Sequence, residues 1–373
     1  MAVRALLFAL CLQPARSVVG TDSSSLLHLP TCVVNKNWAG VNSYFAWALD
    51  VADQETILSN MEKRGLKVMR IFVATVPHHF KGTSAQFVPH LEPDHMGDYN
   101  VTVLNLINDF MVRAKAHNIK LNIVLHDRYA LGCWSCDGYQ KDLGLSCITP
   151  HCGKEPNDVR KFYTDALAIK KFDERLLKIL TYVNPTFGKP WGHLPEVVAM
   201  FAPQNEAQGL DPHWSFQKNW TCARAAVMRK VMDPQILIAT GGGRTFEESS
   251  WKEHFECSVI DVVTLHDYEV AKWTPLMEAL GRAKALALQH GKRVIFEEFG
   301  SKDKEYRPDY FYSTITASVH MGMPFMPWEY MIPGDTKSDD YEFDTYQASW
   351  AILVYGAIIA KESKGAFSWP NIL

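Results

Sequence analysis

The feature that constrains the fold most is a set of eight short, mainly apolar runs spread along the chain. The runs are rich in β-branched and aromatic residues, and segments with helical spacing of apolar side chains separate them. Near-continuous apolar strands indicate a sheet that is covered on both faces, as in a parallel sheet coated by helices. The runs lie at 40–45, 67–73, 120–126, 197–202, 235–240, 260–266, 293–298 and 323–328.

Helices are predicted between these runs. Asp53 is placed to cap a helix whose Ile57, Leu58 and Met61 share one face, and Gly65 ends it before the second run. Strict alternation of eight strands with helices predicts an α/β fold, a (β/α)8 TIM barrel, with a doubly wound open sheet as the main alternative. The further helices are expected at 101–117, 159–182, 214–231, 275–290, 309–321 and 346–360.

The first segment predicts export. Arg4 precedes an apolar run at 5–12, and small residues at 18–20 offer a cleavage site, so residues 1–20 are interpreted as a signal peptide. No Pro/Gly/Ser-rich linker divides the remainder. Residues 21–373 are therefore predicted to form a single barrel domain, with a Cys-rich loop at 129–158, in a secreted, extracellular protein.

Cysteine usage agrees with an oxidising compartment. Cys11 falls within the expected signal peptide, which leaves seven others and hence one expected to stay unpaired. Four of the seven crowd into the loop at 129–158, a spacing that a zinc site would also permit, although disulfides are the favoured interpretation. The seven are Cys32, Cys133, Cys136, Cys147, Cys152, Cys222 and Cys257.

Charge and composition exclude several classes of partner. With 38 basic and 41 acidic residues the net charge is -3, which gives no electrostatic footprint for nucleic acid or an anionic membrane. The late apolar run at 350–360 is shorter than the ~20 residues that a membrane span needs. We expect a soluble monomer without a cofactor, glycosylated at the Asn100 and Asn219 sequons if the source is eukaryotic, and acting on a neutral substrate. The eleven tryptophans are consistent with stacking against sugar faces.

Polar side chains recur where the apolar runs end. In a barrel the active site lies at the C-terminal ends of the strands, so these residues are expected to share one cavity. Arg70 lies within the second run, and because a buried charge is costly unless it is paired, a carboxylate partner is expected beside it. The strand-end residues are His126, Asn205, Glu206, His266, Tyr268, Glu297, Glu298 and Trp328.

Two carboxylates from different strands that face one cavity are the groups that cleavage of a glycosidic bond requires. Glu206 and a glutamate of the seventh run form such a pair. Strand alternation allows only one of the adjacent Glu297 and Glu298 to face the cavity, and it does not decide which.

The ordered motifs carry a resemblance to glycoside hydrolase family 5. They are Asn205-Glu206 after the fourth run, His266-Asp267-Tyr268 after the sixth, and Glu297 to Gly300 at the seventh. The resemblance implies that Glu206 is the acid/base, that Glu298 is the nucleophile, and that the anomeric configuration is retained.

The same resemblance implies supporting roles. Arg70 and Tyr268 would hydrogen-bond the nucleophile and keep it ionised. Each of these residues could instead have a purely structural role. Arg70 could form a salt bridge, and His126 and His266 could be hydrogen-bonded histidines of the core. The other implied substrate-binding residues are Asn205 at the sugar 2-hydroxyl, His266 beside the acid/base, Trp328 beneath the sugar, and His126 at the third strand.

Substrate preference is suggested by two segments, 40–44 and 294–300, that are similar to endo-β-1,4-mannanases of this family. β-1,4-Mannan or a related β-linked polysaccharide or oligosaccharide is therefore the predicted substrate. Ala207 stands where such enzymes carry proline, and the segment after His126 departs from theirs, so a β-glucanase or cellulase stays open. Two further alternatives are a secreted carbohydrate-binding barrel without turnover, and a metal-dependent barrel enzyme using His126, His266 and Glu206.

Overall fold

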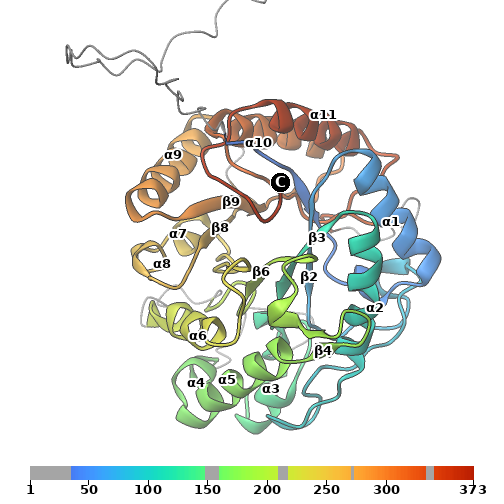
Figure 1. Cartoon of the computed structure of the whole chain (residues 1–373), viewed down its shortest axis with the longest axis vertical. Helices are drawn as coiled ribbons and strands as arrows, with labels where there is room; N and C mark the ends of the chain where they lie inside the picture. The colour runs from blue at the N-terminus through green and yellow to red at the C-terminus, as the bar shows by residue number, and fades with distance from the viewer. Residues whose placement is uncertain (1–34, 148–158, 209–216, 270–272, 333–339) are drawn as a thin grey trace, which may run out of the picture. The chain divides into compact units, whose positions relative to one another are not determined.

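The apolar runs form a ring of parallel strands in the computed structural model, which describes residues 35–147, 159–208, 217–269, 273–332 and 340–373 (Figure 1). A five-stranded parallel sheet runs in the order β1, β2, β3, β6, β7, and β8 pairs in parallel with β9. The strands are β1 Gly40–Asn42, β2 Val68–Phe72, β3 Lys120–Val124, β6 Val198–Ala202, β7 Leu237–Ile238, β8 Val262–His266 and β9 Arg293–Glu298.

Isolated bridges close these sheets into a barrel. Ala239 pairs in parallel with Val262, which joins β7 to β8, and Phe325 pairs in parallel with both Phe296 of β9 and Ala39 before β1. The eighth run, 323–328, thus takes the eighth position although it is no regular strand. Its two prolines lack the N–H groups that a strand ladder needs. The α/β (β/α)8 barrel is confirmed, and the open sheet is excluded.

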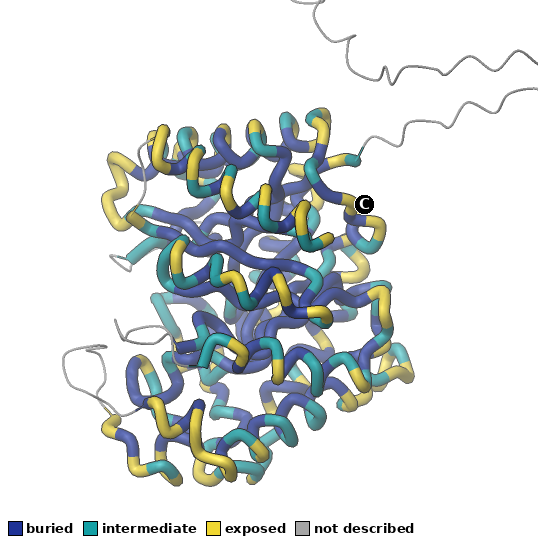
Figure 2. The backbone as a smooth tube through the Cα atoms, turned by 90° about the vertical axis from the view of Figure 1, so that its left-hand side faces the viewer, coloured by how far each residue is buried: buried dark blue, intermediate teal, exposed yellow. Residues whose placement is uncertain are grey.

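Helices surround the ring (Figure 1), and in Figure 2 the exposed positions lie mainly on these helices while the strands inside are buried. The predicted helix at 159–182 is in fact two helices, because Asp165 is extended and its side chain accepts the Ala168 N–H to start the second one. The longer helices are α1 Val51–Lys63, α2 Thr102–Ala116, α5 Ala166–Leu180, α6 Trp220–Arg229, α9 Trp273–His290, α10 Arg307–Met321 and α11 Ala348–Glu362.

Helix α1 shows how a local sequence sets an element. Asp50, not the predicted Asp53, is the N-cap, and its carboxylate accepts the Asp53 N–H at 2.9 Å. The prediction was wrong by one turn, because both aspartates precede the apolar face and only the backbone conformation separates them. Gly65 follows the helix with φ +73°, a left-handed conformation that glycine adopts without strain.

Short elements between the main ones were not predicted. They are the helices α3 Gly138–Asp142, α7 Phe246–Ser249 and α8 Lys252–Glu256, the antiparallel pair β4 Val183–Asn184 and β5 Lys189–Pro190, and the 3-10 turns η1 Ala46–Ala48, η2 Phe80–Gly82, η3 Arg128–Ala130 and η4 Trp191–His193. Helix α4, Arg160–Thr164, is the first of the two helices within the predicted 159–182.

Disulfides, not zinc, account for the described cysteines of the predicted Cys-rich loop. Cys136 bonds Cys147, and Cys133 is also disulfide-bonded, so these three are not available as thiolate ligands. Cys222 of α6 bonds Cys257 at the end of α8. The expected signal peptide at 1–20, Cys32, Cys152 and the remainder of the loop at 148–158 lie outside the described residues.

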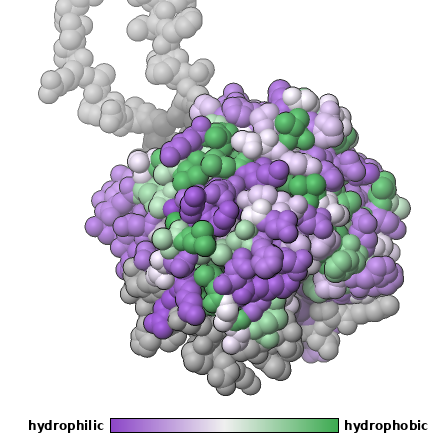
Figure 3. Space-filling view, turned by 90° about the horizontal axis from the view of Figure 1, so that it is seen from below, coloured by the Kyte–Doolittle hydropathy of each residue, from purple (hydrophilic) through white to green (hydrophobic). Residues whose placement is uncertain are grey.

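The molecular surface is mostly hydrophilic on the face drawn in Figure 3, where apolar side chains occur in small, separate groups. Among the described helices, none combines the length and the apolar character that crossing a bilayer would require. Apolar side chains are gathered instead in one core that includes Trp38, Trp47 and Trp191, each at most 2% exposed.

Candidate active site

A cavity of about 450 Å³ lies at the C-terminal ends of the strands. This is the end of a barrel at which active sites are built. Of the eight residues predicted for the site, six line the cavity, and they are His126, Asn205, Glu206, Tyr268, Glu298 and Trp328. The other two, Arg70 and His266, lie behind the cavity wall and are fully buried.

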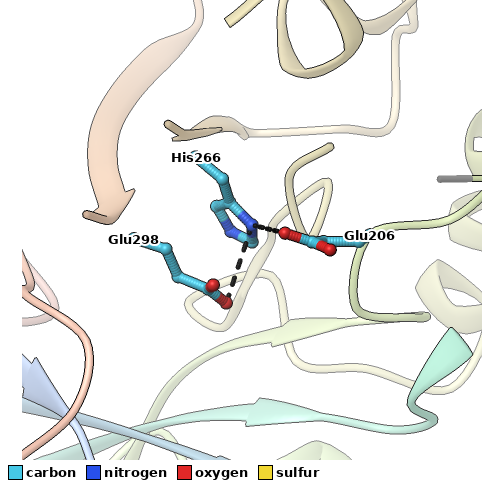
Figure 4. A group of neighbouring side chains, drawn as sticks. All are labelled: Glu206, His266 and Glu298. Atoms are coloured by element: carbon cyan, nitrogen blue, oxygen red, sulfur yellow. Dashed lines mark hydrogen bonds and ion pairs between the residues drawn. The ribbon is translucent and has the colours of Figure 1, made fainter. Parts of the chain in front are cut away.

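Glu206 and Glu298 are brought together at this cavity from β6 and β9. His266, at the end of β8, lies between them, with its Nδ1 3.1 Å from Glu206 Oε1 and 3.6 Å from Glu298 Oε1 (Figure 4). One carboxylate oxygen of each glutamate and the imidazole nitrogen all lie within 4.8 Å of one another. Both glutamates are at most 4% exposed.

Backbone geometry directs the Glu206 side chain toward His266 and Glu298. Its φ of +44° is a left-handed conformation that side chains rarely adopt, and its N–H donates to the Gly241 carbonyl at 2.9 Å. A Cβ at Gly241 would lie 2.0 Å from the Gln204 carbonyl oxygen, and one at Gly242 would lie 2.3 Å from the His266 ring. The Gly-rich turn after β7 therefore permits close packing behind both Glu206 and His266.

Arg70 has the carboxylate partners that its position inside a strand predicts. Its guanidinium donates to Glu298, donates to Asn205 Oδ1 at 2.8 Å, and lies 3.4 Å from Glu297. Burial lowers the pKa of Arg70, but the charges of Glu297 and Glu298 outweigh burial and raise it. Arg70 is thus a fixed positive charge beside the cavity.

Of the two adjacent glutamates, only Glu298 lines the cavity, in agreement with strand alternation. Glu297 is nevertheless not turned outward, because the β8–β9 register shifts between Leu265 and His266. It accepts from Asn122 Nδ2 at 2.6 Å and contacts His266 Nε2 at 2.9 Å. Burial raises the pKa of Glu297, but the Arg70 charge and the His266 hydrogen bond lower it to about 2. This internal role was missed, although a polar Asn122 within an apolar strand was a usable signal.

His266 is held by carboxylates at both ring nitrogens, Glu206 at Nδ1 and Glu297 at Nε2. Two acceptors fit an imidazolium, which carries a proton on each nitrogen. Burial lowers the pKa of His266, but the charge of Glu298 and the hydrogen bonds to Glu206 and Glu297 raise it to about 9. The ring is therefore protonated at neutral pH.

Glu206 and Glu298 each also accept a hydrogen bond from a phenol. Tyr268 donates to Glu298 Oε2 at 2.7 Å, in the predicted position, and Tyr129 donates to Glu206 Oε2. Burial raises the pKa of Glu206. The hydrogen bonds from His266 and Tyr129 and the charges of His266 and Arg70 outweigh burial, and the pKa of Glu206 is lowered overall. Tyr129 was not predicted as a site residue, because its position depends on the loop that follows β3.

Aromatic rings form one wall of the cavity. Trp328 is half-buried and stacks on Tyr44 with 5.5 Å between centroids and an interplanar angle of 9°. Lys81 packs beside Tyr44 and donates to buried Glu329, the residue after Trp328, at 2.7 Å. The tryptophan thus presents its ring from a fixed platform.

His126 lines the cavity, but both of its ring nitrogens have protein partners. Nε2 lies 2.8 Å from Asp137 and Nδ1 lies 2.9 Å from Gln204 Nε2. This is the environment of a satisfied core histidine, and its contact with substrate stays a prediction. The neighbouring Asp127, which was not predicted, lines the cavity and accepts from Asn205 Nδ2 at 3.2 Å. Burial raises the pKa of Asp127 to about 6.

Among the described residues, Glu206, His266 and Glu298 are the one group of acids, histidines and cysteines whose ligand atoms could converge on a metal. His126, in the alternative set with His266 and Glu206, is not among them. The carboxylates of the group already accept hydrogen bonds from Arg70, Tyr268, Tyr129 and His266. Their environment is therefore that of hydrogen-bonded carboxylates beside fixed cations.

Fold and site together define a (β/α)8 barrel with a buried carboxylate pair at the strand ends. No protein-family model matches the sequence, and no curated protein matches it. Solved structures are similar in fold, at 11–17% identity. An endo-1,4-β-mannanase from Rhizomucor miehei aligns with a TM-score of 0.70 at 17% identity, over 88% of this chain and 96% of that one.

Two further structures share the barrel. A glycoside hydrolase family 5 mannosidase from Rhizomucor miehei aligns with a TM-score of 0.69 at 15% identity, over 88% of this chain and 95% of that one. An endoglucanase from Pseudomonas stutzeri aligns with a TM-score of 0.53 at 11% identity, over 87% of this chain and 97% of that one. At such identities the likeness establishes a common fold.

Proposed function

We propose that this protein is a retaining glycoside hydrolase of family 5 that cleaves β-1,4-mannan or a related β-linked polysaccharide. Glu206 acts as acid/base and Glu298 as nucleophile. The observation that supports this most is the approach of the two carboxylates, with oxygens within 4.8 Å. Retaining enzymes place the two carboxyl groups about 5–5.5 Å apart, whereas inverting enzymes leave about 6.5–9.5 Å for a water molecule.

The nucleophile is held in place by two donors. Arg70 and Tyr268 each donate to one oxygen of Glu298, which fixes the orientation of the carboxylate before attack. In the first step a Glu298 oxygen bonds to the anomeric carbon as the bond to the leaving oxygen breaks. In the second step water attacks the same carbon, the glycosyl-enzyme bond breaks, and the carboxylate is regenerated.

The acid/base shares a proton with its neighbour. His266 and Glu206 are hydrogen-bonded, so one proton can reside on the imidazole or on the carboxyl without a change in total charge. Glu206 gives this proton to the leaving oxygen in the first step and takes one from the attacking water in the second. The charge of Glu298 and the hydrogen bonds to Glu206 and Glu297 help His266 to retain its proton at neutral pH.

Substrate recognition is assigned to the cavity wall. Trp328 forms the floor under the sugar at the cleavage point, and Asn205, whose Oδ1 accepts from Arg70, contacts the sugar 2-hydroxyl. Mannan is favoured over β-glucan because the mannanase aligns with a TM-score of 0.70 and the endoglucanase with 0.53. A barrel that only binds carbohydrate is disfavoured by the intact carboxylate pair.

The protein is further proposed to be secreted as a monomer. Residues 1–20 act as the signal peptide, and residues 21–373 form the single catalytic domain. The disulfides support an oxidising compartment. Asn100 and Asn219 are the proposed glycosylation sites.

The proposal is tested by reducing-sugar release from mannan, glucomannan, cellulose and β-1,3-glucan. Glu298→Gln and Glu206→Gln keep the side-chain shape and should each lower kcat on the preferred polymer by about 10³-fold or more. Glu305→Gln, on the exposed surface, is the control and should match the wild type. A chelator should leave the rate unchanged.

Each part of the proposal can fail separately. Full activity of Glu298→Gln would show that Glu298 is not the nucleophile. A wild-type protein that is inactive on every polymer and on its oligosaccharides would show that the protein is not a glycoside hydrolase of these substrates. Loss of activity on chelation, restored by a divalent cation, would favour the metal-dependent alternative.

A further inference from the structure

The loop that follows β3 is a feature that the proposed function has not yet used. Its described part, residues 129–147, begins within the segment 126–133 that does not resemble mannanases in sequence, and it borders the cavity through Tyr129, Ala130, Trp134 and Ser135. Which side of the cavity it borders decides what it can bind.

Tyr129 places the loop on the Glu206 side. Its hydroxyl donates to Glu206, whereas the phenol on Glu298 comes from Tyr268 after β8. The general acid protonates the oxygen of the departing sugar, so that sugar must lie beside Glu206. The loop therefore borders the leaving-group side of the scissile bond.

The geometry of the loop is fixed by its own bonds. The Tyr129 carbonyl accepts the N–H groups of Cys133 at 3.2 Å and Trp134 at 3.0 Å, and the Cys136–Cys147 disulfide closes the turn behind them. Leu131 and Cys136 also form an antiparallel bridge. A side chain on this turn is thus preorganised, and binding it to a ligand costs little further conformational entropy.

Trp134 is the side chain that the turn displays. It is 59% exposed and lines the cavity, and its ring lies 6.3 Å from that of Tyr129 between centroids. Trp328, in contrast, is stacked on Tyr44, and its backbone N–H donates to the carbonyl of Phe299, the residue after Glu298. Two tryptophans thus border the cavity, one from the loop joined to Glu206 and one beside Glu298.

We propose that the turn at 129–136 forms the binding site for the sugar unit on the leaving-group side, with Trp134 as its stacking platform. This rests on the proposed function, since it requires Glu206 to be the general acid. The flat apolar face of a pyranose is the ligand chemistry that an exposed indole at a cavity rim fits.

The test compares two substrates in the full chain. One is a β-linked oligosaccharide of the polymer that the wild type prefers, which has sugars on both sides of the bond, and the other is the matching glycosyl fluoride, which has no leaving-group sugar. Trp134→Ala should lower the ratio of kcat/KM for the oligosaccharide to kcat/KM for the fluoride by about tenfold, the scale of one stacking contact. Trp134→Phe, which keeps a flat ring, should recover part of the ratio.

Trp273→Ala is the matched control, because Trp273 is 44% exposed on α9 and does not line the cavity. It should keep the wild-type ratio. An unchanged ratio in Trp134→Ala would overturn the proposal, and so would an equal loss on both substrates, which would indicate a purely structural loop. A wild type inactive on both substrates would instead refute the proposed function itself.

Discussion

At the scale of single residues, the hydrogen bond from Tyr129 to Glu206 sets the protonation of the proposed acid/base. A donor to a carboxylate favours the ionised form, so Tyr129→Phe should raise the pKa of Glu206. A general acid works in its protonated form, and the alkaline limb of the kcat/KM profile should therefore move to higher pH. The measurement is kcat/KM against pH on the preferred substrate, with a change at the optimum of no more than about tenfold.

Tyr139→Phe is the matched control for this prediction. Tyr139 is buried in the same loop, and its hydroxyl has no hydrogen-bond partner among the described residues. Its removal should leave the profile in place. If Tyr129→Phe also has the wild-type profile, the hydrogen bond does not control Glu206.

Residues of the site were predictable where strand ends fixed them. Arg70, Glu206 and one glutamate of the 297–298 pair follow from charges placed in or after apolar strands, since burial demands partners for them. The choice of Glu298 within that pair came from the family resemblance. Tyr129 and Asp127 were not predictable, because loop geometry brings them into the cavity. The contacts of Glu297 depend on a register shift in the β8–β9 pair, and the alternation of apolar and polar residues in the sequence does not reveal such a shift.

At the scale of elements, the start of α1 makes a direct prediction. Asp50→Ala removes the side chain that accepts the Asp53 N–H, and loss of such a cap should lower the free energy of unfolding by about 1 kcal/mol. Asp50→Asn retains an acceptor oxygen and should recover most of the loss. Urea unfolding followed by far-UV circular dichroism measures both variants. A stable Asp50→Ala would mean that the cap contributes nothing.

Element order was predictable and several boundaries were not. The eight strands and their helices follow from apolar periodicity, because strands that are buried on both faces of a sheet consist mainly of apolar residues. The break at Asp165 depends on a local competition between continuing a helix and capping a new one. The eighth strand is irregular because Pro324 and Pro327 donate no hydrogen bonds.

At the scale of the whole molecule, the buried charge network links stability to pH. The pKa of His266 is raised from 6.5 to about 9, so its contribution to stability is complete below pH 6.5 and is lost as the pH rises through about 9. The free energy of unfolding should fall by about 3 kcal/mol over this window, an order-of-magnitude conversion of the shift. Urea midpoints measured across the window test this.

Glu297→Gln provides the comparison, because it removes one of the carboxylates that raise the pKa of His266. Its stability should decline less steeply over the same window. A wild-type stability that stays constant or increases toward pH 9 would contradict a protonated His266 in the folded protein.

The proposed mechanism requires a covalent bond between Glu298 and the sugar, and mass spectrometry can detect that bond. The protein is incubated with a 2-deoxy-2-fluoro-β-glycosyl fluoride of the preferred sugar, which slows the second step more than the first, and its peptides are analysed by mass spectrometry. One added sugar is expected on the peptide that contains Glu298, and none in Glu298→Gln. An adduct on another residue, or an enzyme that turns over its natural substrate without ever forming an adduct and releases the inverted anomer first, would contradict the proposed mechanism.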